Sequence, residues 1–392
     1  MAHVARKPTM RDVSRLARVS PMTVSRVFTD PARVADDTRA RVLDAVEQLG
    51  YVPDLVAGAL SSRRTNFVGL ILPTLTNSNF GDTAQGLAEV LKEDGYQLLI
   101  GYTLYQVGEE ERLVRALLPR RPDALVIAGN VHTSAARVLL DRAGVPLVEI
   151  WEQPDPPLDC AVGFSNFEVG RAAARHLIGL GHRRIAAIGA QMGTQVRDHR
   201  GDARLKGFAS MLRESQVPDD LVLRFGLPPA SHEQGVAAMN ALLDQAPDVE
   251  AVFAVSDLAA FGALMACHRR AVRVPDQISM MGFGNFEVGR VSFPALTTIG
   301  VNAHAIGRAT GLLLRERLHA DHKSRQGAPQ DRPQEPAPAS PAKAVRLDMG
   351  FELIERETTR ASFRLDSHRA GALSRAGQDF GPHGLPRSRH TS

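Results

Sequence analysis

Residues 10–28 read MRDVSRLARVSPMTVSRVF, and this stretch decides the architecture of the N-terminal part of the chain. Its apolar residues recur at helical spacing on both sides of Ser20 and Pro21, so the pattern predicts two short helices, over residues 10–17 and 22–28. Ser20 is a favourable N-cap and Pro21 suits the first position of a helix, which predicts a tight turn between the two. The residues expected to form the small core between these helices are Val13, Leu16, Ala17, Val24 and Val27.

The start of the second predicted helix points several side chains outward, namely Pro21, Met22, Thr23, Ser25 and Arg26. A helix-turn-helix offers this surface to the major groove of DNA. There Arg26 could hydrogen-bond a guanine, while Thr23 and Ser25 suit phosphates or base edges. The same spacing also fits an ordinary pair of antiparallel helices with solvated arginines.

The charge of the chain is distributed unevenly along its 392 residues. Residues 1–64 carry 11 basic and 7 acidic side chains, and residues 359–392 carry 6 and 2, so two basic ends flank a mildly acidic body. Basic ends of this kind favour a nucleic-acid partner. A hydrophobic fraction of 44% with 23% charged residues is typical of a globular protein.

The sequence also argues against several classes of protein. Cys160 and Cys267 lie far apart, without His or Cys partners at metal-ligand spacing, so neither a disulfide framework nor a zinc site is predicted. The N-terminus lacks the apolar segment of a secretory signal, and there is no run of about 18 apolar residues. We therefore expect a soluble cytoplasmic protein that makes no contact with a membrane.

From residue 67 onward, apolar strand-like runs alternate with helical patterns. These runs cover residues 68–72, 97–100, 124–127, 147–150, 185–188, 252–255 and 278–281. Strands that are apolar on both faces, each followed by a helix, indicate a parallel sheet covered on both sides. The body is therefore predicted to be α/β and doubly wound.

The last 72 residues, 321–392, differ in composition from the preceding body. Residues 321–342 are too rich in Pro, Gln and Ala to pack and are expected to form an insertion or linker. A strand-like segment follows at residues 346–356, and residues 359–392 are predicted to be a disordered basic tail.

The run from Thr9 to Leu60 resembles the DNA-binding headpiece of the LacI family of bacterial transcription regulators. The matching motifs are DV..LA.VS..TVSRV in the helix-turn-helix, residues 34–39 opening a third helix, LGYVP at 49–53, and DLVAGALS at 54–61. The resemblance implies a headpiece over residues 1–53 and a hinge helix with linker over residues 54–65. In the hinge, Leu60 would wedge into the minor groove with Ala57 packed beside it.

The residues that the resemblance and the helix-turn-helix pattern assign to DNA binding are Thr9, Met10, Ser20, Pro21, Met22, Thr23, Ser25, Arg26, Arg33, Tyr51, Ala57 and Leu60. The sequence departs from the family at Asp54, where an Asn is usual, and a negative charge near phosphate would weaken non-specific binding.

Residues 67–358 resemble the effector-binding body of the same family through GHRRI at 181–185, AVFAVSD at 251–257 and PALTTI at 294–299. LPTLTN at 72–77 and EERL at 110–113 are similar to the branch of gluconate-utilisation repressors. The resemblance implies a periplasmic-binding-protein-like pair of α/β subdomains, crossed three times by the chain, with a small molecule in the cleft. Within a core of residues 66–358, the first subdomain would comprise about 66–163 and 295–320, and the second about 164–294 and 343–358.

The cleft implied by this resemblance favours an acidic ligand. Family members that bind neutral sugars commonly carry Asp where Gly284 and Trp151 stand here, and the loss of two carboxylates reduces the repulsion of an anion. Arg200 and Arg204 lie one helical turn apart, and Arg204 opens the family's R-x-x-G motif, so two guanidiniums can hold a carboxylate. The effector-binding residues expected on this basis are Ser78, Asn79, Phe80, His132, Trp151, Asn166, Arg200, Arg204 and Asp257.

Together these features predict a homodimeric repressor of sugar-acid catabolism genes. Gluconate or a related sugar acid would release it from a pseudo-palindromic operator, and no catalytic residue, metal or cofactor is expected. One alternative is a regulator of the same family that responds to another sugar or to a phosphosugar. A solute-binding protein would need a secretion signal, and an NAD-dependent enzyme is disfavoured because the glycine pattern at residues 282–287 lacks the third Gly of GxGxxG.

Overall fold

The structure is a computed structural model that describes residues 7–29, 31–52, 65–326 and 344–362. The chain divides into two compact units, Met1–Phe67 with Leu117–Asp123, and Val68–Ala116 with Ala124–Ser392. Ala57, Leu60 and the predicted hinge helix lie outside the described residues, as do residues 327–342 of the predicted insertion and nearly all of the predicted tail.

The N-terminal unit contains the predicted helix-turn-helix. Its helices are α1 (Met10–Ala17), α2 (Pro21–Thr29), the short 3-10 helix η1 (Pro31–Arg33) and α3 (Asp36–Leu49). Thr9 and Asp12 form a capping box at the start of α1, and the Ser20 hydroxyl accepts the backbone N–H of Thr23 at 3.0 Å, which confirms the predicted cap of α2.

The core of this unit is small and apolar, as the sequence predicts. Val13 and Val24 are fully buried against Val42 of α3. The sequence predicts Leu16 in this core, but 46% of its surface is exposed. The buried face of α1 is formed by Val13 and Ala17, which lie four residues apart on one side of the helix.

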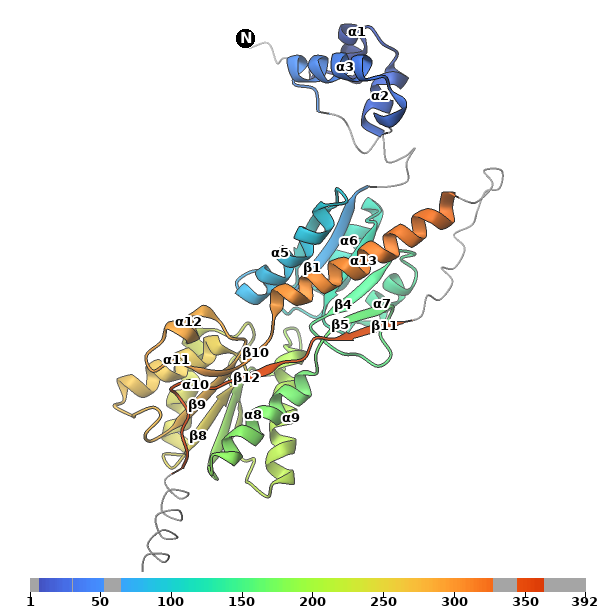
Figure 1. Cartoon of the computed structure of the whole chain (residues 1–392). Coiled ribbons are helices and arrows are strands. Elements are labelled where there is room, and N and C mark those ends of the chain that lie inside the picture. The colour runs from blue at the N-terminus through green and yellow to red at the C-terminus, as the bar shows by residue number, and fades with distance from the viewer. Residues whose placement is uncertain (1–6, 30, 53–64, 327–343, 363–392) are drawn as a thin grey trace, which may run out of the picture. The chain divides into compact units, whose positions relative to one another are not determined.

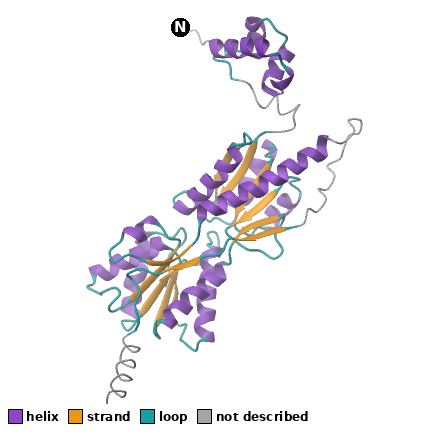
Figure 2. Ribbon diagram, viewed as in Figure 1, coloured by secondary structure: helices purple, strands orange, loops and turns teal. Residues whose placement is uncertain are grey.

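In the described part of the body there are two sheets of six strands each, with helices on their faces (Figure 2). The first sheet has the order β11-β5-β4-β3-β1-β2. Its strands are β1 (Phe67–Leu72), β2 (Gln97–Tyr102), β3 (Ala124–Ala128), β4 (Leu147–Ile150), β5 (Cys160–Gly163) and β11 (Val345–Asp348). The helices of this subdomain are α5 (Ser78–Lys92), α6 (Glu109–Leu117), η2 (Leu118–Arg120), α7 (Ser134–Asp141) and α13 (Ala303–Gln326), and α13 packs along α5 (Figure 1).

The second sheet has the order β12-β10-β9-β8-β6-β7. Its strands are β6 (Ile185–Gly189), β7 (Val222–Arg224), β8 (Ala251–Ala254), β9 (Ser279–Phe283), β10 (Thr297–Gly300) and β12 (Glu352–Ile354). The helices of this subdomain are α8 (Asn166–Gly179), α9 (His199–Glu214), α10 (His232–Gln245), α11 (Asp257–Arg269) and α12 (Glu287–Val291).

Both faces of the second sheet are buried, as the continuous apolar runs predict. Along β6, Ile185 and Ala187 join the cluster under α8 and α9, while Ala186 and Ile188 join the cluster under α10 and α11. The period of two in a strand sends successive side chains to opposite faces, so each apolar run has to pack on two layers of helices. The predicted doubly wound α/β body is thereby confirmed.

The chain passes between the two subdomains three times, and this exchange corrects the predicted bounds. β10, expected in the first subdomain, pairs with β9 in the second sheet, and β11, expected in the second, pairs with β5 in the first. The strand-like run at residues 346–356 is in fact two strands in different sheets. Gly350, with φ of 62°, lies in the turn between them, where a left-handed backbone suits glycine.

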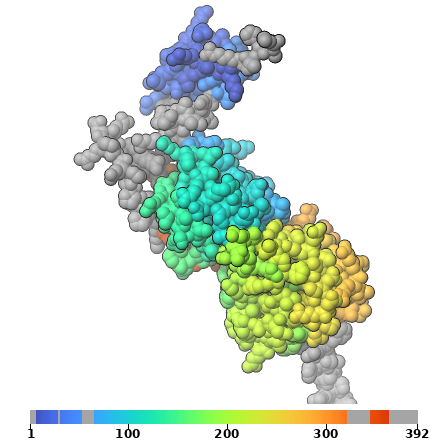
Figure 3. All heavy atoms as spheres, turned by 180° about the vertical axis from the view of Figure 1, so that it is seen from behind, coloured from blue at the N-terminus to red at the C-terminus, as the bar shows by residue number. Residues whose placement is uncertain are grey.

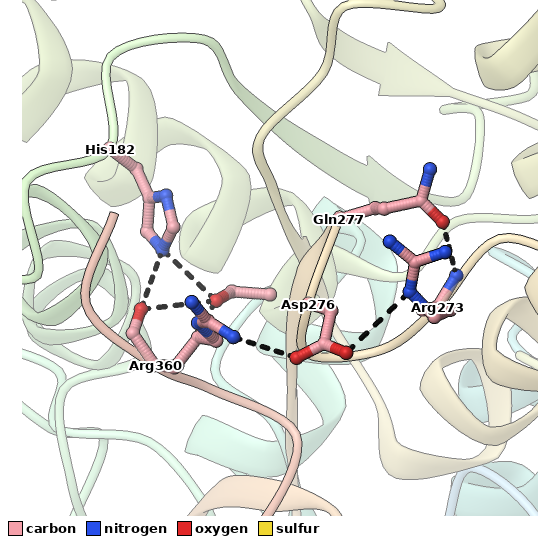
Figure 4. A network of polar contacts seen from close by, with 6 residues as sticks. His182, Arg273, Asp276, Gln277 and Arg360 are labelled. Carbon is pink, nitrogen blue, oxygen red and sulfur yellow. Dashed lines mark hydrogen bonds and ion pairs between the residues drawn. The ribbon is translucent and has the colours of Figure 1, made fainter. Parts of the chain in front are cut away.

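The bounds of the insertion and the tail also differ from expectation. Helix α13 continues to Gln326, six residues into the predicted insertion. At the C-terminus, the backbone oxygen of Arg360 lies 3.1 Å from His182 Nε2, and the Arg360 guanidinium donates to Asp276 at 2.7 Å (Figure 4). Residues 359–362 are therefore held against the second subdomain rather than belonging to the tail.

Candidate functional site

Two adjoining cavities lie between the two subdomains of the body. The larger, of about 330 Å³, is lined by residues at the ends of β1, β2 and β3 and by Arg197, His199 and Arg200 of the second subdomain. The smaller, of about 40 Å³, lies between the start of α5 and residues of the second subdomain, including Phe283. In the space-filling view the teal first subdomain borders the yellow-green second subdomain along one boundary (Figure 3). Carboxyl ends of parallel strands are where α/β sheets bind ligands.

Arg204 lines the smaller cavity and is almost completely buried. Its Nε donates to the backbone oxygen of Val255 at 3.1 Å, Nη1 donates to the amide oxygen of Asn166, and its guanidinium carbon lies 4.2 Å from the centre of the Phe283 ring. Burial lowers the pKa of Arg204, but a guanidinium remains charged at neutral pH. Its orientation is fixed before any ligand arrives.

Arg200 lines both cavities and joins the two subdomains. Its Nη1 donates to the backbone oxygen of Ala128 at 3.0 Å, and the guanidinium lies 5.6 Å from the centre of the Phe80 ring. Helix α9 begins next to it, with Asp198 as the N-cap that accepts the N–H of Gly201. The helix thus projects Arg200 and Arg204 from successive turns into the same cleft, as their spacing predicts.

The sequence does not identify several ionisable groups of the cleft, among them Tyr105, Glu152 and Asp198. Glu152 and Tyr105 line the larger cavity, and Asp198 lines the smaller one. Burial raises the pKa of Glu152, and burial also raises the pKa of Tyr105 to about 12, so its phenol stays neutral. The sequence predicts a locally basic cleft, whereas the structure sets carboxyl groups beside its arginines.

The structure brings together six of the nine predicted effector-binding residues, namely Asn79, Phe80, His132, Trp151, Arg200 and Arg204. Asn79 donates from Nδ2 to the backbone oxygen of Gly284 at 3.0 Å, across the two subdomains. Trp151 is buried, donates from Nε1 to Thr83 at 3.2 Å and packs edge-on against Phe80. Both residues therefore support the walls of the cleft.

Ser78, Asn166 and Asp257 do not line either cavity. Ser78 is exposed at the start of α5, and the Asn166 amide is occupied by Arg204 and by the backbone oxygen of Trp151. The Asp257 carboxylate accepts the Thr298 hydroxyl and the backbone N–H of Phe286, which ties the start of α11 to β10.

Burial raises the pKa of Asp257 to about 6. Its neighbour Ser256 faces the smaller cavity instead. After β8 the cavity is therefore lined by Val255, Ser256 and Leu258, on either side of the predicted Asp257.

A short antiparallel bridge between Gln106 and Val196 joins the two subdomains beside the larger cavity. The backbone N–H of Val107 donates to Gln195 O, and that of Arg197 donates to Tyr105 O, both at 2.9 Å. We call residues 103–107 with residues 195–197 the strap. Opening the cleft on this side requires both hydrogen bonds to break.

The headpiece presents most of its predicted DNA-binding residues on the surface. Pro21, Met22 and Arg26 are exposed along the start of α2, with Ser20 at its cap, while Thr23 and Ser25 are half-buried. Arg33 is exposed in η1, and Thr9 and Met10 are half-buried at the start of α1. Tyr51 differs from the expectation, because only 8% of its surface is exposed and its ring belongs to the headpiece core.

Within the described residues, no group of His, Cys, Asp and Glu has the arrangement of a metal site. The same part of the chain contains no helix with the length and apolar character needed to cross a lipid bilayer.

Comparison with known proteins agrees with this division. The model for lacI family bacterial regulatory proteins matches residues 9–54, and that for a periplasmic binding protein-like domain matches residues 174–359. The HTH-type transcriptional regulator GntR of Pseudomonas aeruginosa is 35% identical over 354 residues, covering 90% of this chain and 96% of that protein. The protein of the same name from Escherichia coli K12 is 30% identical over 295 residues, covering 75% and 87%.

A solved structure of a lacI family transcriptional regulator from Silicibacter pomeroyi has a TM-score of 0.77 and 32% identity, covering 90% of this chain and 99% of that chain. A helix-turn-helix joined to a body of two subdomains around a cleft defines a ligand-responsive regulator of transcription. The chain belongs to the lacI family of bacterial regulatory proteins. It is a DNA-binding transcriptional regulator and not an enzyme.

Proposed function

We propose that this regulator is a homodimeric repressor of sugar-acid catabolism genes, which a gluconate-type sugar acid releases from a pseudo-palindromic operator. Two headpieces would each read one half-site through the start of α2. The assigned DNA contacts are Thr9, Met10, Ser20, Pro21, Met22, Thr23, Ser25, Arg26 and Arg33, with Ala57 and Leu60 in the hinge. Support for a dimer comes from the lac repressor, which shares the fold at 23% identity and was solved as a dimer bound to operator.

The observation that carries the proposed effector is the pair of arginines in the cleft. Arg200 and Arg204 are held rigidly by Ala128, Val255 and Asn166, and preorganised guanidiniums bind carboxylates well. The related regulator CelR, at 30% identity, was solved in complex with cellobiose, which supports a saccharide-like ligand in such a cleft. Asn79, Phe80, Trp151 and Ser256 complete the proposed effector site.

The test is release of DNA by a series of compounds. An operator is first selected by the full-length protein from a random DNA pool, and its binding is then followed by fluorescence anisotropy. Gluconate, 6-phosphogluconate, 2-ketogluconate and neutral hexoses are titrated in turn, and we expect one or more of the acids to release the DNA. Release by only a neutral hexose or a purine would contradict the proposed acidic effector.

Variants of α9 connect this response to the arginine pair. Arg204→Ala is expected to raise the concentration of acid needed for release by roughly tenfold or more, because a charge-assisted hydrogen bond contributes about 1.5–3 kcal/mol. The matched control is Arg213→Ala, which removes an exposed arginine from the same helix. A wild-type response in the Arg204→Ala protein would remove Arg204 from the site.

A further inference from the structure

Three ionisable groups form a chain beside the larger cavity, two of them with buried side chains. Glu110 lies in the first turn of α6, His132 follows β3, and Glu149 belongs to β4. His132 Nδ1 lies 2.7 Å from Glu110 Oε1, and His132 Nε2 lies 3.2 Å from Glu149 Oε1. The exposed fraction of the side chain is 2% for His132, 2% for Glu149 and 15% for Glu110.

His132 lines the cavity but has no free N–H group to donate to a ligand in this arrangement. Burial lowers its pKa, but the hydrogen bonds to Glu110 and Glu149 outweigh burial and raise the pKa to about 9, so the ring is an imidazolium at neutral pH. Both of its N–H groups are directed at carboxylates, which leaves no donor for an effector. The prediction that His132 contacts the effector is therefore replaced by a role in holding Glu110.

Glu149 anchors the other end of the chain of charges. Its Oε2 accepts the backbone N–H of Leu158 at 2.7 Å, while its Oε1 faces His132. Both oxygens are thus engaged, and the position of the His132 ring is fixed by the main chain behind it. In many proteins, apolar residues of similar volume stabilise the folded state at least as well as a buried ion pair does. Stability alone therefore does not explain why Glu110, His132 and Glu149 are charged groups.

Glu110 lines the cavity together with His132, whereas Glu149 does not. One oxygen of Glu110 faces His132, and within the described residues no hydrogen bond occupies its Oε2. A carboxylate oxygen accepts hydroxyl protons and repels a second anion. Arg200 lines the same cavity and continues into the smaller one, so the cleft offers a guanidinium and a carboxylate to different parts of one ligand.

The remaining charged groups of the larger cavity nearly balance one another. Arg197 and Arg200 line it together with Glu152 and Glu110, and His132 compensates Glu149. Burial is the largest cause of the lowered pKa of His199, the other imidazole in this wall, and the lowered pKa favours its neutral form. A second negative charge on a ligand would therefore meet little excess positive charge here.

We propose that Glu110 is an effector-binding residue that accepts a hydroxyl of the polyol chain, and that His132 and Glu149 are positioning residues for it. This inference rests on the proposed function and narrows the effector to an acid with one carboxylate and a hydroxylated far end. A diacid of the same length would set its second carboxylate against Glu110.

Gluconate and glucarate test the proposal, because they differ only at C6, which carries a hydroxyl in one and a carboxylate in the other. Their affinities for the full-length protein are measured by titration calorimetry, and we expect gluconate to bind more tightly by roughly tenfold or more. Glu110→Gln retains an acceptor and removes the charge, so it should bring the two affinities close together. Glu111→Gln, in the same turn and paired with Arg115, is the matched control and should keep the wild-type ratio.

His132→Gln tests the positioning role separately, because it keeps Glu110 but removes the ring that holds it, so it should weaken gluconate binding and change the ratio of the two affinities. A wild-type ratio in that variant would contradict the role of His132. Equal binding of both acids to the wild-type protein would overturn the inference while leaving a sugar-acid effector in place. Binding of neither acid would overturn the proposed function as well.

Discussion

At the scale of single residues, the cleft shows which functional side chains a sequence can reveal. Arg204 was identified because it opens a motif and lies one turn from Arg200 on a helix, and both line the cleft. The sequence does not identify Tyr105, because this residue lies in a loop with φ of 63°. Residues other than glycine seldom adopt this conformation, and no sequence pattern predicts it here. Asp257 was misassigned because a carboxylate beside a ligand and one that fixes a helix start look alike in sequence.

The buried His132 gives a prediction on stability. Its pKa in the folded protein, about 9, lies above the value of about 6.5 in an unfolded chain, so the folded state binds the proton more tightly. The stabilisation is therefore fully present below pH 6.5 and is lost as the pH rises through 9. Between pH 6.5 and pH 9, the free energy of unfolding of wild type should therefore fall by about 3 kcal/mol more than that of His132→Gln.

The measurement is urea unfolding of the body at pH 6.5, 7.5 and 9 for both proteins. The control is His304→Gln, which removes a half-exposed histidine paired with Glu89 and should follow the wild-type pH dependence. If the free energy of unfolding changed with pH in the same way for wild type and His132→Gln, the two glutamates would not raise the pKa of His132.

At the scale of elements, local sequence patterns predict most helices and strands correctly. They do not predict which strands pair with one another, because these pairs join residues far apart in the sequence. Ser20 and Pro21 mark the start of α2, and continuous apolar runs mark β1, β3, β6 and β8. β10 and β11 each lie in the sheet opposite to the one predicted, because β10 pairs with β9 and β11 pairs with β5. These pairings depend on where the chain crosses between the subdomains, which no local sequence pattern encodes. The short strands β5 and β7, of four and three residues, also went unpredicted.

The strap gives a prediction at this scale. Gln106 and Val196 face each other between two flanking backbone hydrogen bonds, a geometry that brings Cα atoms to about 4.5 Å and permits a disulfide. Gln106→Cys with Val196→Cys, when oxidised, should slow gluconate association and dissociation by roughly an order of magnitude, because the cleft cannot open at the strap.

Stopped-flow fluorescence of Trp151, which lines the smaller cavity, follows the exchange of ligand in both redox states. The reduced double variant and the Gln106→Cys single variant serve as controls, and the native Cys160 and Cys267 are both buried. Equal rates before and after oxidation would show that ligand enters by a route that does not involve the strap.

At the scale of the whole molecule, the uneven charge of the chain acquires a meaning. The basic N-terminal part contains the helix-turn-helix, and the acidic body contains the cleft, whose arginines are balanced by Glu110, Glu152 and Asp198. Net charge alone favoured a nucleic-acid partner, but only the motif at residues 10–28 located it. The basic residues beyond residue 362 lie outside the described part of the chain.

We propose that the body binds a sugar acid and that this binding is transmitted to the headpiece. This coupling is tested most directly by measuring gluconate affinity with the protein alone and with the protein saturated by its selected operator. Linkage requires operator to weaken gluconate binding by the same factor as gluconate weakens operator binding, typically about 5–150-fold. We predict two equal factors in that range, whereas an unchanged gluconate affinity in the presence of operator would show that the two sites are not coupled.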